Sequence, residues 1–313
     1  MKNILVTGGC GFIGSYVVAE LLEQEDVVIY NVDKLGVGSS EENIKDHPRV
    51  KNYFLDIAKK DFYEDLPKID YIVHLAAESH VDRSITDPLA FVDSNVKGTA
   101  NVLELARIDN ARMVHVSTDE VYGHLQQHEA PFTEESPLQP RSPYSASKAG
   151  SDLLVLSYIN TYGLNASITR CCNNYGPRQH YEKFIPTIVN SLVRGEQIPV
   201  YGAGDNIREW IFAEDHAKAI IEVLFTEHAA TVYNIPGSIT LTNLQLVESI
   251  VKVIESKYPE YLRLEQDYIK FVSDRLGHDF KYELSTQHEL DAVKNQREFD
   301  LYPTVKYYVD RQS

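Results

Sequence analysis

Short apolar runs alternate with amphipathic segments along the first half of the chain. Segments with helical spacing cover residues 12–24, 95–108 and 145–162. The runs of strand length are "NILVTG" (3–8), "VVIYNVD" (27–33), "VKNYFLDI" (50–57), "IDYIVHLAA" (69–77), "RMVHVST" (112–118) and "NASITRC" (165–171). Apolar strands that alternate with helices are typical of a parallel sheet covered by helices on both faces. The pattern therefore predicts an α/β fold with a Rossmann-type, doubly wound parallel sheet.

The regular alternation ends near Cys172. Beyond this point, prolines separate shorter elements: Pro177, Pro186, Pro199, Pro236 and Pro303. We expect residues 1–172 to form the sheet domain, with some later segments returning to it. Residues 173–313 are expected to form a smaller C-terminal α/β lobe.

Composition narrows the class of protein. The 313 residues include 46 acidic and 30 basic side chains, a net charge of -16 that argues against non-specific binding to nucleic acid. No apolar run approaches the roughly 18 residues of a membrane span, and the start "MKNILVTGG" lacks the features of a signal peptide. Cys10, Cys171 and Cys172 have neither a disulfide pattern nor zinc-ligand spacing. We expect a cytoplasmic protein that binds no membrane, nucleic acid or metal.

A glycine-rich turn precedes the first predicted helix. Gly8, Gly11 and Gly14 in "TGGCGFIG" would let the backbone approach a pyrophosphate at the N-terminus of that helix. Asp33, at the end of the second strand, would accept hydrogen bonds from adenosine ribose hydroxyls and repel a 2′-phosphate. NAD is therefore favoured over NADP, although Lys34 directly after Asp33 weakens the preference.

Other candidate cofactor-binding residues follow from the same placement. Asp56, after the third strand, could meet the adenine edge or be an ordinary strand-end residue. Ala76 and Ala77, after the fourth strand, are small enough for a dinucleotide to pass close by. The remaining candidates are Phe12, Ile13, Ile57, Ser94 and Ser117.

Two motifs carry candidate chemistry. "YSASK" places Tyr144 and Lys148 on one face of a predicted helix. A Tyr has a pKa of about 10, and a nearby ammonium together with a positive nicotinamide ring would favour the phenolate. "HVSTDEVYG" ends a strand with Thr118, Asp119 and Glu120, a hydroxyl and two acids that a core strand does not need. We therefore expect a tyrosine-dependent alcohol oxidation with an acid–base pair beside it.

These motifs occur in a known order. With "LAAESHVDRSI", "CCNNYGPRQHYEKFIP", "VYGAGDNIREWIFAEDHAKAI" and "DRLGHD", they resemble the extended short-chain dehydrogenase/reductase family from Lys2 to about Tyr282. Within that family, the chain is most similar to nucleotide-hexose 4,6-dehydratases of the dTDP-glucose type. The 4-epimerases resemble "SSATVYG" and the decarboxylases "TSEVYG", so the adjacent Asp119 and Glu120 favour a dehydratase.

The resemblance implies a mechanism with bound NAD. Tyr144, assisted by Thr118 and Lys148, would remove the proton from the sugar O4 while hydride leaves C4. Glu120 would then remove the C5 proton, and protonated Asp119 would protonate the departing C6 hydroxyl. Return of hydride to C6 would give a 4-keto-6-deoxy sugar. In this interpretation residues 1–172 bind NAD, residues 173–313 bind a UDP- or dTDP-hexose, and the protein is a homodimer.

The resemblance also assigns substrate contacts. Arg208 and Arg275 match the family's phosphate-binding arginines. Further matches are Glu78, Asn174, Lys183, Tyr201, Asn243 and His278. The chain departs from the family in "KLGVGSSEEN" after Asp33 and in Leu276, where Pro is usual. Three alternatives therefore stay open: a UDP-N-acetylglucosamine 4,6-dehydratase that also inverts C5, a 4-epimerase or decarboxylase, and a catalytically inactive NAD-sensing module.

Overall fold

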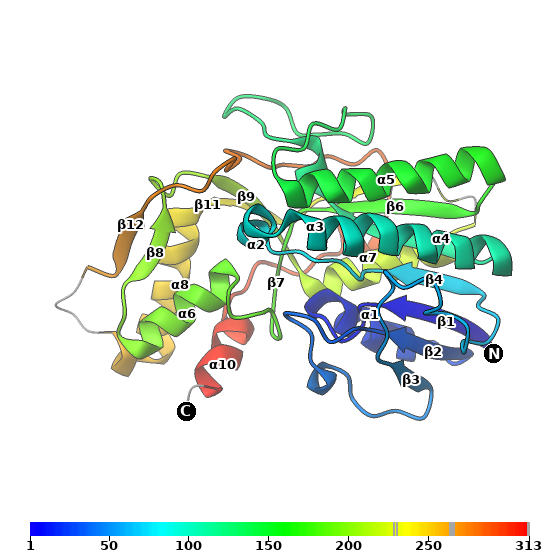
Figure 1. Ribbon diagram of the computed structural model, residues 1–313. Coiled ribbons are helices and arrows are strands. Elements are labelled where there is room, and N and C mark those ends of the chain that lie inside the picture. The colour runs from blue at the N-terminus through cyan, green and yellow to red at the C-terminus, as the bar shows by residue number, and fades with distance from the viewer. Residues whose placement is uncertain (228, 230, 263–266, 312–313) are drawn as a thin grey trace.

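A parallel sheet forms the larger part of the protein (Figure 1). The computed structural model describes all residues except 228, 230, 263–266 and 312–313. The seven strands lie in the order β10-β6-β5-β4-β1-β2-β3, and every neighbouring pair is parallel. They are β1 (Lys2–Thr7), β2 (Val27–Val32), β3 (Val50–Tyr53), β4 (Tyr71–His74), β5 (Arg112–Thr118), β6 (Ala166–Cys171) and β10 (Val232–Ile235).

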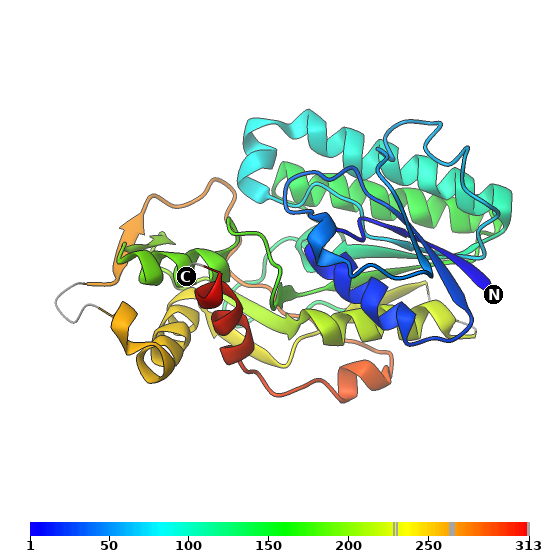
Figure 2. The ribbon, with the colours of Figure 1, turned by 90° about the horizontal axis from the view of Figure 1, so that it is seen from below.

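Helices cover both faces of this sheet (Figures 1 and 2). On one face lie α1 (Phe12–Leu22) and α7 (Ala213–Phe225), and on the other α4 (Gly98–Asp109) and α5 (Pro143–Tyr162). Alternate residues of β1 belong to different cores: Ile4 packs in the cluster that contains α1, whereas Leu5 packs in the cluster that contains α4. This alternation follows from the two-residue period of a strand. The predicted doubly wound fold is confirmed.

Element boundaries differ from the sequence-based expectation at three places. β3 ends at Tyr53 and β4 at His74, so both strands are shorter than the apolar runs that contain them. The predicted helix 95–108 begins within a π-helical segment η2 (Val92–Lys97), which follows α2 (Val81–Thr86) and α3 (Pro88–Phe91). The apolar periodicity of the sequence did not predict this π-helical segment, because a π turn differs from an α turn by less than one residue and the segment is short.

The smaller lobe contains two short sheets, on the left in Figure 1. One has the order β11-β9-β7 and the other pairs β12 with β8. The strands are β7 (Asn173–Tyr175), β8 (Ile198–Tyr201), β9 (Ile207–Phe212), β11 (Ile239–Thr242) and β12 (Ile269–Val272). The helices are α6 (Phe184–Arg194), α8 (Asn243–Lys257) and α10 (Tyr302–Asp310), together with the short η4 (Pro259–Tyr261), which packs against α6 and α8. Three more short segments lie elsewhere in the chain: η1 (Glu41–Asn43), η3 (Asp119–Tyr122) and α9 (Asp291–Lys294).

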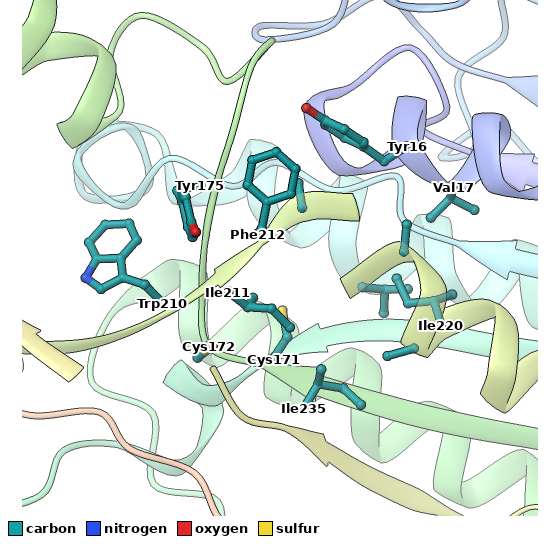
Figure 3. Packing of buried hydrophobic residues seen from close by; sticks show 14 of the residues in the cluster. Tyr16, Val17, Cys171, Cys172, Tyr175, Trp210, Ile211, Phe212, Ile220 and Ile235 are labelled. Carbon is teal, nitrogen blue, oxygen red and sulfur yellow. The ribbon is translucent and has the colours of Figure 1, made fainter. Parts of the chain in front are cut away.

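Aromatic packing joins the lobe to the sheet (Figure 3). The ring of Phe212 on β9 lies with its centroid 6.1 Å from that of Tyr16 on α1 and 5.3 Å from that of Tyr175 on β7, both edge-to-face. These three side chains and Trp210 are all buried. Because β9 is fixed by this shared core, the residues at its start hold a constant position relative to the sheet.

None of the helices in the described part of the chain is both long and apolar enough to cross a membrane.

Candidate functional site

A cavity of about 310 Å³ opens at the carboxyl edge of the sheet, where strand order reverses between β1 and β4. Such a reversal is where ligands bind in doubly wound sheets. The glycine turn forms one wall: Gly8 has φ of 78°, and a Cβ at Gly14 would lie 2.1 Å from the carbonyl oxygen of Gly8. Only glycine permits this packing, which brings the N-terminus of α1 to the cavity.

Asp33 lies at the end of β2 with its side chain turned into this cavity wall. It is 4% exposed; one carboxylate oxygen accepts from the backbone N–H of Cys10 at 3.0 Å and the other from that of Leu35 at 2.8 Å. Burial raises its pKa, while these hydrogen bonds and Lys34 lower it. Oδ2 also accepts a long hydrogen bond from the hydroxyl of Ser39 at 3.4 Å, whereas Oδ1 keeps a further lone pair. The oriented carboxylate therefore suits a ribose hydroxyl.

Most of the predicted cofactor residues line this cavity, and one does not. Those that do are Gly8, Gly11, Phe12, Ile13, Gly14, Asp33, Lys34, Ile57, Ala76, Ala77, Ser94, Ser117, Tyr144 and Lys148. Asp56 lies outside the lining as far as the described residues show, although Leu55 and Ile57 on either side belong to it. Its carboxylate accepts from the N–H of Ala58 at 2.9 Å and caps the turn after β3. The strand-end alternative for Asp56 therefore agrees with its contacts.

Asp119 and Glu120 follow β5 directly and both line the cavity. The hydroxyl of Thr118 donates to Asp119 Oδ1 at 3.1 Å and accepts from the N–H of Glu120 at 3.3 Å, which fixes the turn that separates the acids. Burial, and then the charge of Glu120, raise the pKa of Asp119 to about 8. Its Oδ2 is buried and has no hydrogen-bond partner among the described residues. Asp119 can therefore hold a proton at neutral pH and donate it.

Glu120 lies where the first cavity meets a second one of about 280 Å³. Burial raises its pKa, while Arg208 and Lys183 lower it. The two acids are therefore unequal: Asp119 is more completely buried, and Glu120 has cations nearby that stabilise its ionised form. This difference suits one acid to donate a proton and the other to accept one.

Tyr144 and Lys148 lie in the first turns of α5. Ser142 forms a capping box with Ser145, and Pro143 occupies the first helical position, so the helix starts at a defined residue. Lys148 Nζ donates to the carbonyl oxygen of Val116 at 2.8 Å, and burial lowers its pKa to about 8.

The phenol of Tyr144 is buried close to the carboxyl group of Glu120. Burial, and then Glu120, raise its pKa well above the usual range, and a hydrogen bond with Thr118 lowers it only in part. The positive nicotinamide ring that the sequence analysis expects beside Lys148 would act in the opposite direction and favour the phenolate.

The second cavity contains most of the predicted substrate contacts. They are Lys183, Tyr201, Arg208, Asn243, Arg275 and His278. Arg275 forms an ion pair with Asp82 of α2: Nη2 donates a hydrogen bond to Oδ2 at 2.9 Å, and Nε lies 2.6 Å from Oδ1 without hydrogen-bond geometry. The guanidinium of Arg208 donates instead to backbone carbonyls, including that of Asp279 at 2.8 Å. Two arginines that are held by protein partners and one lysine thus line this cavity, and such cations are suited to bind phosphate oxygens.

Two predicted substrate residues lie in the first cavity instead, Glu78 and Asn174. Asn174 Oδ1 lies 2.9 Å from Nδ1 of His216, which holds the amide in place. The carboxylate of Glu78 lies 2.7 Å from Nζ of Lys34, at the cofactor end of the cavity. Glu78 therefore lies at the Lys34 end of the first cavity, apart from the predicted substrate residues that line the second cavity.

The sequence did not identify several further residues of the second cavity, among them Asp82, Trp210, Asp279 and Tyr282. Trp210 is the single Trp of the chain and stands beside Arg208, a signal that could have been used. Asp82 and Asp279 lie inside motifs that the resemblance covers, but nothing in a sequence pairs Asp82 with Arg275, 193 residues away. The hydroxyl of Tyr282 donates to Asp279.

Within the described part of the chain, no three or more His, Cys, Asp or Glu side chains are grouped so that they could hold a metal ion.

A glycine turn before α1, an acid after β2 and a buried Tyr–Lys pair on α5 are the features of a dinucleotide-dependent oxidoreductase, to which Asp119 and Glu120 add an acid–base pair. Residues 5–305 match the GDP-mannose 4,6 dehydratase family, and the chain belongs to that family of nucleotide-sugar dehydratases.

Named relatives agree with this assignment. The chain is 45% identical over 297 residues to the low-salt glycan biosynthesis protein Agl12 of Haloferax volcanii, covering 93% of this chain and 91% of that protein. It is 40% identical over 336 residues to dTDP-glucose 4,6-dehydratase of Haemophilus influenzae, covering 100% and 99%. The crystal structure of DesIV, a dTDP-glucose 4,6-dehydratase of Streptomyces venezuelae with NAD bound, superposes with a TM-score of 0.91 at 39% identity and covers 99% of this chain and 98% of that one.

Proposed function

We propose that this protein is an NAD-dependent nucleotide-hexose 4,6-dehydratase that acts on dTDP-glucose. The observation that carries the proposal is the buried Asp119 directly beside Glu120, in one cavity with Tyr144, where burial raises the pKa of Asp119 to about 8. Elimination of water needs an acid for the leaving hydroxyl and a base for the C5 proton, and these two carboxyl groups supply both. The named relatives favour the same reaction.

The cofactor end of the cavity suits NAD. The N-terminus of α1 would hold the pyrophosphate, and Asp33 would accept from the adenosine ribose. Bound NAD would accept a hydride from the sugar and later return it. The positive charge of its oxidised ring would also act on Tyr144, whose pKa the protein alone raises.

The chain's own groups divide the proton transfers among them. Tyr144 takes the proton from the sugar O4, and the carbonyl that results makes the C5 hydrogen acidic. Glu120 takes that proton, and Asp119 gives its own to the C6 hydroxyl as the hydroxyl leaves. Lys148, held by Val116, supplies positive charge behind the phenol. When hydride returns to C6, the protonated Glu120, which exchanges with solvent, gives a proton back to C5, and the proton held by Tyr144 replaces the one that Asp119 gave. The pKa of about 8 suits Asp119 to the donor role at C6.

The second cavity would hold the nucleotide diphosphate. Lys183 and Glu120 line both cavities, so a sugar between them would have its diphosphate toward Arg275 and its reacting carbons toward Tyr144. Tyr201 and Asn243 would then lie near the nucleoside. With Arg208, these are the residues that we propose bind the substrate.

The alternative functions have less support. A 4-epimerase or decarboxylase has no use for both acids, and an inactive sensor has no use for the complete set of Thr118, Asp119, Glu120, Tyr144 and Lys148. Two of the three relatives named above are dTDP-glucose 4,6-dehydratases, which disfavours UDP-N-acetylglucosamine as the substrate.

We further propose a cytoplasmic homodimer that associates through α4 and α5. Ile108 on α4 is 58% exposed, and Leu153 and Tyr162 on α5 are 58% and 56% exposed. Large apolar side chains on neighbouring helices suit a self-complementary interface. The three cysteines are buried and free, which suits a reducing compartment.

The deciding experiment is incubation with dTDP-glucose and, separately, UDP-N-acetylglucosamine in deuterated water. We expect dTDP-glucose to lose one water and to gain deuterium at C5, as detected by mass spectrometry and NMR. If dTDP-glucose keeps all its oxygen atoms after prolonged incubation, the proposed dehydratase activity is refuted. Reaction of the UDP sugar alone, or inversion at C5, would refute the proposed substrate or outcome.

A further inference from the structure

The ion pair between Lys34 and Glu78 bears on which dinucleotide the protein accepts. Nζ of Lys34 lies 2.7 Å from a carboxylate oxygen of Glu78, and both side chains line the first cavity. Lys34 follows Asp33 directly, and Glu78 lies in the segment after β4. The pair therefore connects the ends of two strands on either side of β1.

Lys34 is a basic residue at a position where it could favour NADP over NAD. A basic side chain beside the acid at the end of β2 accommodates the 2′-phosphate of NADP. Other cations in the cavity lining are Arg83, Lys148 and Lys183. Lys148 is bonded to Val116 and Lys183 to the carbonyl oxygen of Ser79, so neither belongs to the β2 end.

The backbone of Glu78 is held in a position from which its carboxylate pairs with the ammonium of Lys34. Its N–H donates to Asn95 Oδ1 at 2.8 Å, and its carbonyl oxygen accepts from Asn95 Nδ2 at 3.0 Å. The amide of Asn95 is fixed in turn by Ser147 Oγ at 2.8 Å. A Cβ at Gly36 would lie 3.1 Å from Cε of Lys34 and 3.8 Å from Glu78, so the following loop packs against one side of the pair, whose side chains remain 37% and 21% exposed.

We infer that Glu78 determines cofactor specificity by neutralising Lys34, so that the β2 end presents only the negative charge of Asp33 to a 2′-phosphate. The inference rests on the proposed function, because it concerns the dinucleotide of the same site. In the wild type, Lys34 contributes little attraction for phosphate, since its charge is already compensated at 2.7 Å. Removing the carboxylate restores that attraction and removes a repulsion at the same time.

The test measures which dinucleotide is bound and does not depend on turnover. Protein is equilibrated with equal concentrations of NAD⁺ and NADP⁺, freed of unbound nucleotide, and the retained nucleotides are quantified by chromatography. We expect Glu78→Gln to raise the bound NADP:NAD ratio about tenfold over wild type. Glu42→Gln removes the same charge from an exposed position on η1 and is expected to leave the ratio unchanged.

Two further variants separate the roles of the pair. Lys34→Gln alone is expected to change the ratio less than about twofold, because its charge is already compensated; this arm remains informative if Glu78→Gln does not fold. The double variant should lose the gain of Glu78→Gln. An unchanged ratio in Glu78→Gln, a marked loss of NADP in Lys34→Gln, or the same gain in the double variant would overturn the inference. Wild-type protein that retains neither dinucleotide would overturn the proposed function as well.

Discussion

Replacing Asp119 by Asn should stabilise the fold while it disables elimination. Asn keeps the shape of the side chain and can accept from Thr118 at the same oxygen, which now lies 3.1 Å away. It carries no charge at any pH and has no acidic proton to donate. The variant therefore separates the energetic cost of the buried acid from its chemical use.

The magnitude follows from the pKa of Asp119, which rises from 3.8 to about 8 in the folded protein. An acid whose pKa is raised on folding holds its proton longer in the folded state, so stability falls as pH rises from about 4 to about 8. At about 1.36 kcal/mol for each unit, the cost is about 1.6 kcal/mol at pH 5 and about 5 kcal/mol at pH 8. Asn has no such cost, so its advantage over wild type should grow by about 4 kcal/mol across this range.

Urea unfolding at pH 5, 6, 7 and 8 measures this difference directly. Asp46→Asn, at an exposed position, is the matched control and should run parallel to wild type at every pH. Parallel curves for wild type and Asp119→Asn would show that the carboxyl ionises normally, and the assignment of Asp119 as the acid would lose its physical basis. In single turnovers the same variant should accumulate reduced nicotinamide, because C4 oxidation proceeds and elimination slows by about 10²–10⁴-fold.

Three further substitutions test other parts of the site. Tyr144→Phe should lower kcat about 10²–10⁴-fold while calorimetry finds nucleotide-sugar binding unchanged; activity near that of wild type would exclude Tyr144 as the base. Asp82→Asn removes the charge that is paired with Arg275. It should raise KM for the nucleotide sugar about tenfold and leave kcat within about twofold. An unchanged KM would mean that Asp82 does not orient the guanidinium. Ser142→Ala removes the capping box of α5 and should cost about 1 kcal/mol in the free energy of unfolding; a loss near zero would mean that packing alone fixes the start of the helix.

The sequence by itself determined the features that depend on short spacings. Alternating apolar runs indicated the doubly wound sheet, since the period of two in a strand and of 3.6 in a helix is a local property. The three-residue spacing of Gly8, Gly11 and Gly14 indicated the turn before α1. The four-residue spacing of Tyr144 and Lys148 placed both on one face of α5. The resemblance to a family then supplied the roles that spacing cannot.

Only the tertiary structure decided the electrostatics of the site. The pKa of Asp119 depends on how completely β5, β6 and the smaller lobe exclude water, and no local pattern encodes that burial. The same burial acts on Tyr144 in the opposite sense to the effect expected of Lys148.

The sequence also did not predict the ion pairs between residues that are distant in the chain. Lys34 meets Glu78 where β2 and β4 end, and Arg275, in the segment after β12, meets Asp82 of α2. Both pairs form because segments distant in the chain converge in the fold. Charges interact through space, whereas sequence patterns report only neighbours along the chain. The sequence therefore identified the candidate ionisable residues, and the fold determined their pKa values and their partners.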